Sequence, residues 1–259
     1  MSWFPSLTAQ FCPAPYDERG APPPAGKMIF APTEVGPPPI VYKFTYFGLF
    51  AKGPAPALAL ALSGVDYEIS FPADWKSMKP TTNWGHLPVL EMCGQQVGHE
   101  IAILNVIGQS SLKMGGLTPA DFSVSQQLLQ QAEDIYQKLV KGQNTLYAKD
   151  KSSAEESAEL WGSADATKHS GTTGIPVPLG FLEAFCAHDD KFTDSGVTVG
   201  ECKLWAVLHT LKMIKPTVLD GFPKLAAFYA RVAALEPTTQ LLEGKLKGMS
   251  WPFKQYFVA

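Results

Sequence analysis

The stretch Val41 to Gly64, VYKFTYFGLFAKGPAPALALALSG, decides the fold. Its first six residues alternate between apolar and polar positions, which predicts a β-strand over Val41 to Tyr46. The apolar positions that follow favour a helix over Lys52 to Leu62, and Tyr67 to Phe71 again suits an extended strand. Two short strands and a helix complete the pattern by about Gly108. Mixed strands and helices in this order predict one small α/β layer.

The second half of the chain has a different pattern, with helical periods from Pro119 onwards and no convincing strand. Apolar residues between Gln126 and Val140 recur at helical spacing and give one buried stripe. Thr198 and Glu201 have the spacing of a capping box, which predicts the start of a helix there. Further helical patterns cover Cys202 to Met213, Phe222 to Leu235 and Pro237 to Leu246.

Two segments do not fit either pattern. Residues 1–39 carry ten of the 22 prolines, and proline lacks the amide donor that helices and sheets need, so we expect an extended arm. Residues 142–178 are rich in Gly, Ser, Thr and Asp, which predicts a surface insertion with at most a short helix over Ala154 to Trp161.

Composition excludes several classes of function. The net charge of −3 gives no basic excess to bind nucleic acid or an anionic membrane. No apolar run reaches the roughly 20 residues of a spanning helix, so we expect no membrane insertion. The four cysteines form no CxxC pair, which suits free thiols in a reducing compartment, and we expect a soluble, intracellular and most simply cytoplasmic protein. No phosphate-binding glycine loop is present, and His188-Asp189-Asp190 is typical of a solvated loop rather than a metal site.

An α/β layer followed by helices, with Leu87-Pro88-Val89-Leu90 between them, resembles the glutathione transferases. Val41 to Gly64 resembles the opening strand, tyrosine turn and first helix of the Sigma class. Ala73-Asp74-Trp75 with Lys79 resembles that class's second glutathione-contacting stretch, and LPVLEMCG its cis-proline turn and hairpin. The resemblance implies a thioredoxin-like domain over residues 40–112 and an all-helical domain over 117–250, interrupted by the 142–178 insertion and preceded by the 1–39 arm.

The same resemblance implies a binding site for glutathione, a thiol tripeptide, with no metal and no other cofactor. Tyr46 matches the catalytic tyrosine, whose hydroxyl donates a hydrogen bond that favours the thiolate over the thiol. Without the resemblance, Tyr46 is a strand-end tyrosine that packs its ring inward. The residues that match glutathione-binding positions are Lys52, Trp75, Lys79, Leu87, Pro88, His99 and Glu100.

Four residues at or beside those positions depart from the class. Lys52 stands where an arginine is usual, which keeps the charge and loses the two-pronged guanidinium. His86 replaces a glutamine before the Leu87-Pro88 turn. His99-Glu100 replaces a Gln-Ser pair that receives the γ-glutamyl carboxylate at a helix N-terminus.

Glu100 is the largest departure, because an acceptor-only carboxylate replaces a hydroxyl donor where the ligand also carries a carboxylate. Two like charges about 4 Å apart at a dielectric of about 20 repel by roughly 4 kcal/mol, about a thousandfold in affinity. This predicts weak glutathione binding, and tighter binding when Glu100→Ser is combined with His99→Gln. Two alternatives remain: Glu100 turns outward as a first-turn helix acid, or it pairs with Lys52 or His99.

Two functions follow from these residues. The favoured one is a non-catalytic accessory subunit with a degraded site, docked to protein partners by residues 1–39 and 142–178, because His99-Glu100 replaces the Gln-Ser pair and the proline-rich arm needs contacts to become ordered. The other is an active Sigma-like transferase or isomerase that uses Tyr46. The resemblance also implies a homodimer built on the α/β layer and the first long helix, where Glu133-Asp134 would lie. His209, between apolar positions of a helix, is expected to be a packed residue rather than a ligand.

Overall fold

The computed structural model describes residues 41–151, 153–162, 165, 167, 173–188 and 190–258. The predicted arm and Cys12 lie outside these residues. The first domain is built on a four-stranded sheet with the order β3-β1-β4-β5. Its strands are β1 (Val41–Thr45), β3 (Asp66–Ser70), β4 (Val89–Met92) and β5 (Gln95–Gly98).

The sheet follows from the alternation seen in the sequence. β1 runs parallel to β3, with Phe44 beside Ile69, and antiparallel to β4, with Phe44 beside Leu90. All three of these side chains are buried, so the apolar face of the sheet is the one that the helices cover. The connections between β1, β3 and β4 carry α1 (Pro54–Ser63), α2 (Trp75–Met78) and a 3-10 turn (Lys79–Thr81). α1 starts two residues later than expected, because Pro54 suits the first helical position.

The second domain is helical. After α3 (Glu100–Ser110), which closes the sheet domain, its helices are α4 (Leu112–Gly115), α5 (Pro119–Gly142), α6 (Ala154–Gly162), α7 (Pro176–Phe185), α8 (Val199–Ile214), α9 (Pro223–Ala233) and α10 (Glu236–Glu243). The sequence predicts α5, α6, α8, α9 and α10 to within a few residues, except that α5 begins seven residues earlier at Pro119. The capping box at the start of α8 is formed, since both the Thr198 and the Glu201 side chains accept backbone amides.

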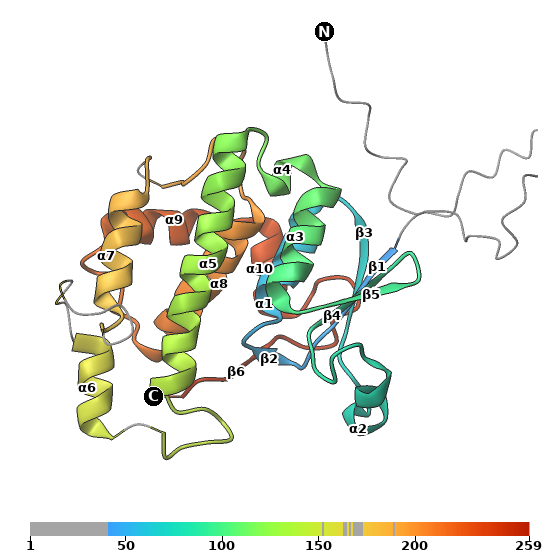
Figure 1. Cartoon of the computed structure of the whole chain (residues 1–259), viewed down its shortest axis with the longest axis horizontal. Helices are drawn as coiled ribbons and strands as arrows, with labels where there is room; N and C mark the ends of the chain where they lie inside the picture. Colours follow the sequence, from blue (N-terminus) through green and yellow to red (C-terminus); the bar gives the residue numbers. More distant parts are fainter. Residues whose placement is uncertain are drawn as a thin grey trace, which may run out of the picture. The chain divides into compact units, whose positions relative to one another are not determined.

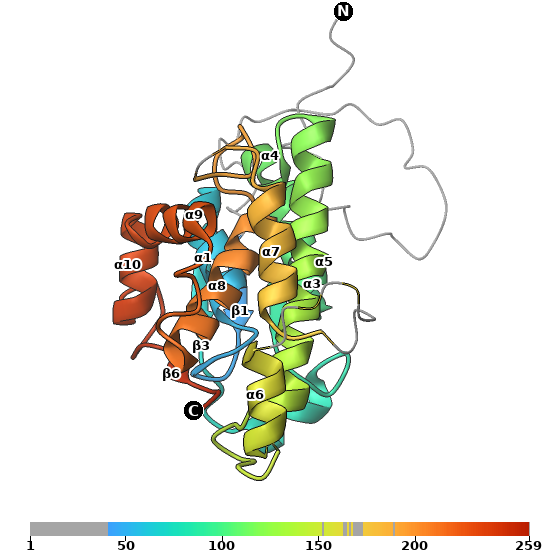
Figure 2. The ribbon, with the colours of Figure 1, turned by 90° about the vertical axis from the view of Figure 1, so that its left-hand side faces the viewer.

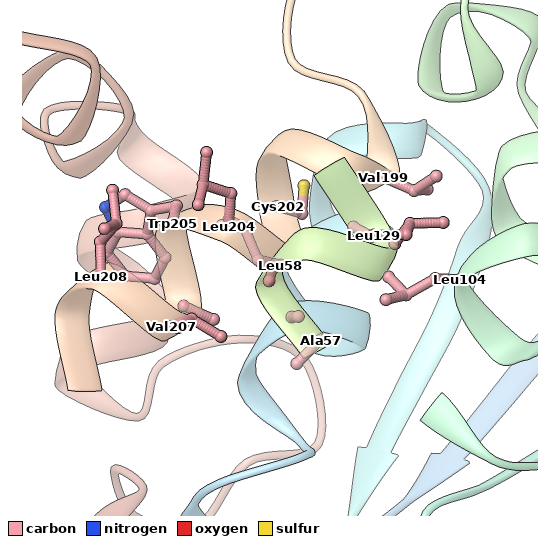
Figure 3. Packing of buried hydrophobic residues seen from close by; sticks show 14 of the residues in the cluster. Ala57, Leu58, Leu104, Leu129, Val199, Cys202, Leu204, Trp205, Val207 and Leu208 are labelled. Carbon is pink, nitrogen blue, oxygen red and sulfur yellow. The ribbon is translucent and has the colours of Figure 1, made fainter. Parts of the chain in front are cut away.

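The two domains share one core. Figure 1 shows α1 and α3 between the sheet and the helices α5 and α8, and Figure 2, turned by 90°, shows α7 and α6 beside α5. Figure 3 shows side chains from four helices gathered in one cluster; those labelled there are Ala57, Leu58, Leu104, Leu129, Val199, Cys202, Leu204, Trp205, Val207 and Leu208. This packing fixes α8 against the sheet domain, and therefore fixes any site between them.

Two sequence expectations are corrected here. The second half does contain a strand, because β6 (Lys254–Gln255) pairs in parallel with β2 (Leu49–Phe50). The 142–178 segment is also more than a surface insertion: Ile175 is fully buried, its amide bonds to the Leu160 carbonyl at 2.8 Å, and α7 begins inside the segment. Ile175 and Leu160 are apolar residues spaced among polar ones, so composition alone did not reveal them.

The expectation of four free thiols holds for Cys186 and Cys202, which are free and buried. It is wrong for Cys93, which is disulfide-bonded, so the argument for a reducing compartment loses part of its support. In the part of the chain that the structure describes, no helix combines the length and the apolar character that crossing a bilayer requires.

Candidate active site

Tyr46 lies at the end of β1 with 7% of its surface exposed. Its hydroxyl oxygen accepts the backbone amide of Lys52 at 3.1 Å. Gly53 gives the ring its room, since a Cβ there would lie 2.2 Å from the Tyr46 Cδ1 atom. The amide occupies the oxygen and, among the described residues, no acceptor takes the hydroxyl proton. The Tyr46 hydroxyl can therefore still donate a hydrogen bond to a ligand.

Burial keeps this donor neutral. Loss of solvent raises the pKa of Tyr46 well above its usual value of 10.0; the Lys52 amide opposes that shift and the charge of Glu100 adds to it. A phenol in this state keeps its proton at neutral pH and can donate it to a hydrogen bond.

Tyr46 lines a cavity of about 410 Å³, within the range of small-molecule sites. Four segments far apart in the sequence form its wall: the turn after β1, α5, the 142–178 segment and the C-terminal tail. The lining residues are Tyr46, Phe47, Leu49, Ala51, Lys52, Tyr136, Tyr147 and Tyr256. An aromatic wall with one lysine suits an apolar organic molecule.

Trp75 and Lys79 lie beside this region. The Trp75 ring meets Phe47 edge-on at 5.4 Å, and Phe47 meets Tyr46 at 5.8 Å, so aromatic contacts join α2 to the tyrosine. Lys79 is exposed, and its Cε atom lies 3.7 Å from where a Cβ on Gly85 would be. The structure thus brings Trp75 toward Tyr46 and leaves the Lys79 ammonium in solvent.

Leu87 and Pro88 are buried directly before β4, and the peptide bond between them is cis. Within the described residues, the backbone of Leu87 makes no hydrogen bond of its own. An extended ligand could therefore pair with it as a neighbouring strand would.

His99 precedes α3 in an unusual conformation, with φ of 65° and ψ of 126°. Such a backbone is strained for a residue with a side chain, and strain of this kind gathers at functional sites. The His99 ring is 4.6 Å from the His86 ring and 5.8 Å from that of Trp84, which is 64% exposed. His99 offers no side-chain cap, so the first amides of α3 have no cap from this residue.

Glu100 does not take any of the positions expected from the sequence. It turns neither outward nor toward Lys52 or His99; its side chain is 2% exposed and forms an ion pair with Lys203 of α8, which is 1% exposed. The expectation that its charge faces a ligand carboxylate therefore loses its basis. Burial raises the pKa of Glu100, and the Lys203 ammonium opposes that rise.

This ion pair belongs to a longer series of alternating charges. Lys203 also contacts Glu133 of α5 at 3.0 Å, and the other Glu133 oxygen binds the Lys52 ammonium at 2.8 Å. Burial opposes ionisation of Glu133, yet Lys203, Lys52 and Gln137 together lower its pKa to about 2. Both ammonium groups also lie over the Tyr136 ring, at 5.1 and 5.0 Å. We call Glu100, Lys203, Glu133 and Lys52 the charge series.

Sequence reasoning missed Lys203, and it placed Glu133 at a subunit contact. One signal was available: Lys203 stands between Cys202 and Leu204 in a helix of buried residues, and a buried lysine needs a partner. His209 is packed, as predicted, because it stacks on Trp205 and bonds to the Tyr229 hydroxyl at 2.8 Å. His188 contacts Asp194 at 3.5 Å and Asp189 lies outside the described residues, among which no group of three metal-binding side chains forms.

A thioredoxin-like sheet domain that ends in α3 and is followed by a helical domain defines the fold class of the cytosolic glutathione transferases, which confirms the predicted fold. The chain is 26% identical to hematopoietic prostaglandin D synthase of Gallus gallus over 75% of its own length and 91% of that protein. It is 25% identical to glutathione S-transferase 4 of Caenorhabditis elegans over the same two shares.

The solved glutathione S-transferase of Ascaris lumbricoides superposes with a TM-score of 0.62 over 80% of this chain and 98% of that one, at 22% identity. No protein-family model matches the chain. The chain therefore has the fold of the glutathione S-transferases and is similar in sequence, at low identity, to members of that family and to a prostaglandin D synthase.

Proposed function

We propose that the chain is an active glutathione transferase or glutathione-dependent isomerase that uses Tyr46 to activate the glutathione thiol. The observation that carries this proposal is Tyr46, which lines a 410 Å³ cavity and whose neutral hydroxyl accepts the Lys52 amide and keeps its own proton. A thiol with a pKa of about 8.5 needs such a donor to become a thiolate at neutral pH.

The function favoured by the sequence, a non-catalytic subunit, depended on the His99-Glu100 replacement, with Glu100 repelling the ligand, and on the proline-rich arm. The buried ion pair weakens the argument from repulsion, because the Lys203 ammonium group compensates the Glu100 charge inside the core. For the same reason, the expectation that Glu100→Ser combined with His99→Gln binds glutathione more tightly loses support. The serine would also leave the buried Lys203 with one carboxylate fewer.

In the proposed reaction, glutathione lies along the edge of the first domain. The Leu87 backbone pairs with the tripeptide, Trp75 and Lys79 hold its glycine end, and the first amides of α3 receive the γ-glutamyl carboxylate. Tyr46 donates to the sulfur, which favours the thiolate. The thiolate then attacks an electrophilic atom of an apolar molecule held among the aromatic residues of the cavity, so that proximity supplies much of the rate.

The relatives suggest further properties. A homodimer is consistent with the family, and we propose a cytosolic location on the same ground. Docking of protein partners by residues 1–39 and 142–178 stays a prediction; the first range lies outside the described residues.

The test combines binding and turnover. Calorimetry with glutathione is expected to give micromolar binding, and conjugation of 1-chloro-2,4-dinitrobenzene is expected to depend on Tyr46. Tyr46→Phe removes the donor and keeps the ring, so turnover at neutral pH should fall by about 10²-fold or more while binding changes little. Tyr42→Phe is the matched control: Tyr42 lies in β1, four residues before Tyr46, does not line the cavity, and donates its hydroxyl to Ser110.

A natural protein that binds no glutathione at millimolar concentration would contradict the proposal and return the accessory-subunit hypothesis. Binding with turnover that Tyr46→Phe leaves unchanged would contradict the role of Tyr46.

A further inference from the structure

Lys203 is a cation in the middle of the protein. It lies on α8 between Cys202 and Leu204, which are fully buried, and its own side chain is 1% exposed. Taking an ammonium group out of water costs several kcal/mol unless carboxylates and hydrogen bonds compensate it. Two carboxylates do so here, from Glu100 on α3 and Glu133 on α5.

The partner of this lysine is the first residue of α3. Helix N-termini attract negative charge, so the amides of the first turn of α3 are a second place where the Glu100 carboxylate could bind. Lys203 binds one Glu100 oxygen, and the other oxygen is buried with no hydrogen-bond partner among the described residues. Lys203 is thus what holds this carboxylate inside the protein.

We propose that Lys203 is a positioning residue of the glutathione site: it holds Glu100 in the core, so that the first amides of α3 stay open for the carboxylate of the ligand. This inference rests on the proposed function, which puts the γ-glutamyl carboxylate at those amides. Without Lys203, the Glu100 carboxylate turns toward the start of α3 and competes there with the ligand.

The charge series supports the same role from its other end. Lys203 holds Glu133, Glu133 holds the Lys52 side chain at 2.8 Å, and the backbone amide of Lys52 donates to the Tyr46 hydroxyl at 3.1 Å. The buried Lys203 ammonium group is therefore connected to two parts of the proposed site: the position of the ligand carboxylate, through Glu100, and Tyr46, through Glu133 and Lys52. Its loss should be felt in ligand binding rather than in stability alone.

The experiment uses two ligands that differ in one group: glutathione, and the analogue in which 4-aminobutanoic acid replaces the γ-glutamyl residue and so lacks the α-carboxylate. Calorimetry measures the Kd of both for the natural protein, Lys203→Met, and Glu100→Gln combined with Lys203→Met. Lys212→Met is the control, because Lys212 is on the same helix and donates to the Pro216 carbonyl, outside the charge series.

Lys203→Met should raise the Kd for glutathione about tenfold or more and leave the Kd for the analogue nearly unchanged, since only glutathione competes with Glu100. The double variant should bind glutathione within about threefold of the natural protein, because the competing charge is gone. Lys212→Met should change neither Kd.

Equal losses for both ligands, or a double variant as weak as Lys203→Met, would show that Lys203 only supports the fold and would overturn the inference. Should Lys203→Met fail to fold, Glu100→Asp shortens the carboxylate arm by one methylene, weakens its pair with Lys203, and should give the same loss for glutathione alone. If the natural protein binds neither ligand, the proposed function and this inference are both overturned. If the natural protein binds glutathione and Lys203→Met does not weaken glutathione more than the analogue, only the inference is overturned.

Discussion

Two buried glutamates near helix N-termini are held in opposite ways. Glu201, in the first turn of α8, accepts hydrogen bonds from the Thr198 and Phe192 amides and from the Thr193 hydroxyl. Arg231 adds a cation at 3.6 Å. Glu100, the first residue of α3, depends on a single ion pair with Lys203 and leaves one oxygen unbonded.

The difference separates a structural carboxylate from one that a site controls. Several fixed donors stabilise the Glu201 carboxylate whether or not a ligand is bound. Through these donors, Glu201 joins α8 to the loop before it and to α9. A single lysine, in contrast, leaves Glu100 with another arrangement within reach at the start of α3. The predictions that follow test how far this contrast extends.

The largest expected effect is on Glu201. Glu201→Ala leaves the Phe192 and Thr198 amides without their acceptor and removes one of the two carboxylates that Arg231 contacts, so it should lower the free energy of unfolding by about 3–5 kcal/mol. Urea unfolding measures this. Glu236→Ala is the control, since Glu236 is also a first-turn acid but is exposed, and it should change stability by less than about 1 kcal/mol. A loss at Glu201 as small as at Glu236 would end the contrast.

The second effect concerns His209, a partly buried titratable group of α8 whose hydrogen-bond partner, the Tyr229 hydroxyl, is neutral. Burial first, and then Lys212, lowers the pKa of His209 from 6.5 to about 4. The unfolded chain therefore binds more protons than the folded protein below pH 6.5. The stability that neutral His209 provides is complete above pH 6.5 and is lost as the pH falls toward 4, by about 3 kcal/mol in all.

Unfolding by urea at pH 7 and pH 5 tests this against His209→Gln, which cannot titrate. About 2 kcal/mol of the stability lost by the natural protein between these pH values should be absent in the variant. If both proteins lose the same amount, His209 is protonated in the folded state and its stacking on Trp205 does not exclude solvent as the structure indicates.

How well the sequence predicted each of these groups depends on the distance between partners along the chain. Thr198 and Glu201 are three residues apart, and their spacing alone predicted the capping box. Lys203 and Glu100 are 103 residues apart, so only the packing of α8 on α3 brings them together. The same reason hid the pairing of β2 with β6, in which Leu49 lies beside Lys254. The sheet and the main helices followed local patterns and Tyr46 followed from the family resemblance, whereas the cavity wall required the final fold.

The smallest effect is on Thr198, which shares its contacts with Glu201. Its hydroxyl accepts the Glu201 amide and lies 3.1 Å from the Glu201 carboxylate, and the residue is fully buried. Thr198→Ala should cost about 1–2 kcal/mol of unfolding free energy, and Thr198→Ser much less, because the serine keeps the hydroxyl. Thr118→Ala provides the matched control, since Thr118 caps α5 through the Asp121 amide at an exposed position and should cost about 0.5–1 kcal/mol.

The double variant Thr198→Ala with Glu201→Ala sharpens the result, because two residues of one network should lose less together than the sum of their separate losses. Strict additivity would mean that the two side chains act independently, and that the group of donors around Glu201 is no more cooperative than the single lysine that holds Glu100.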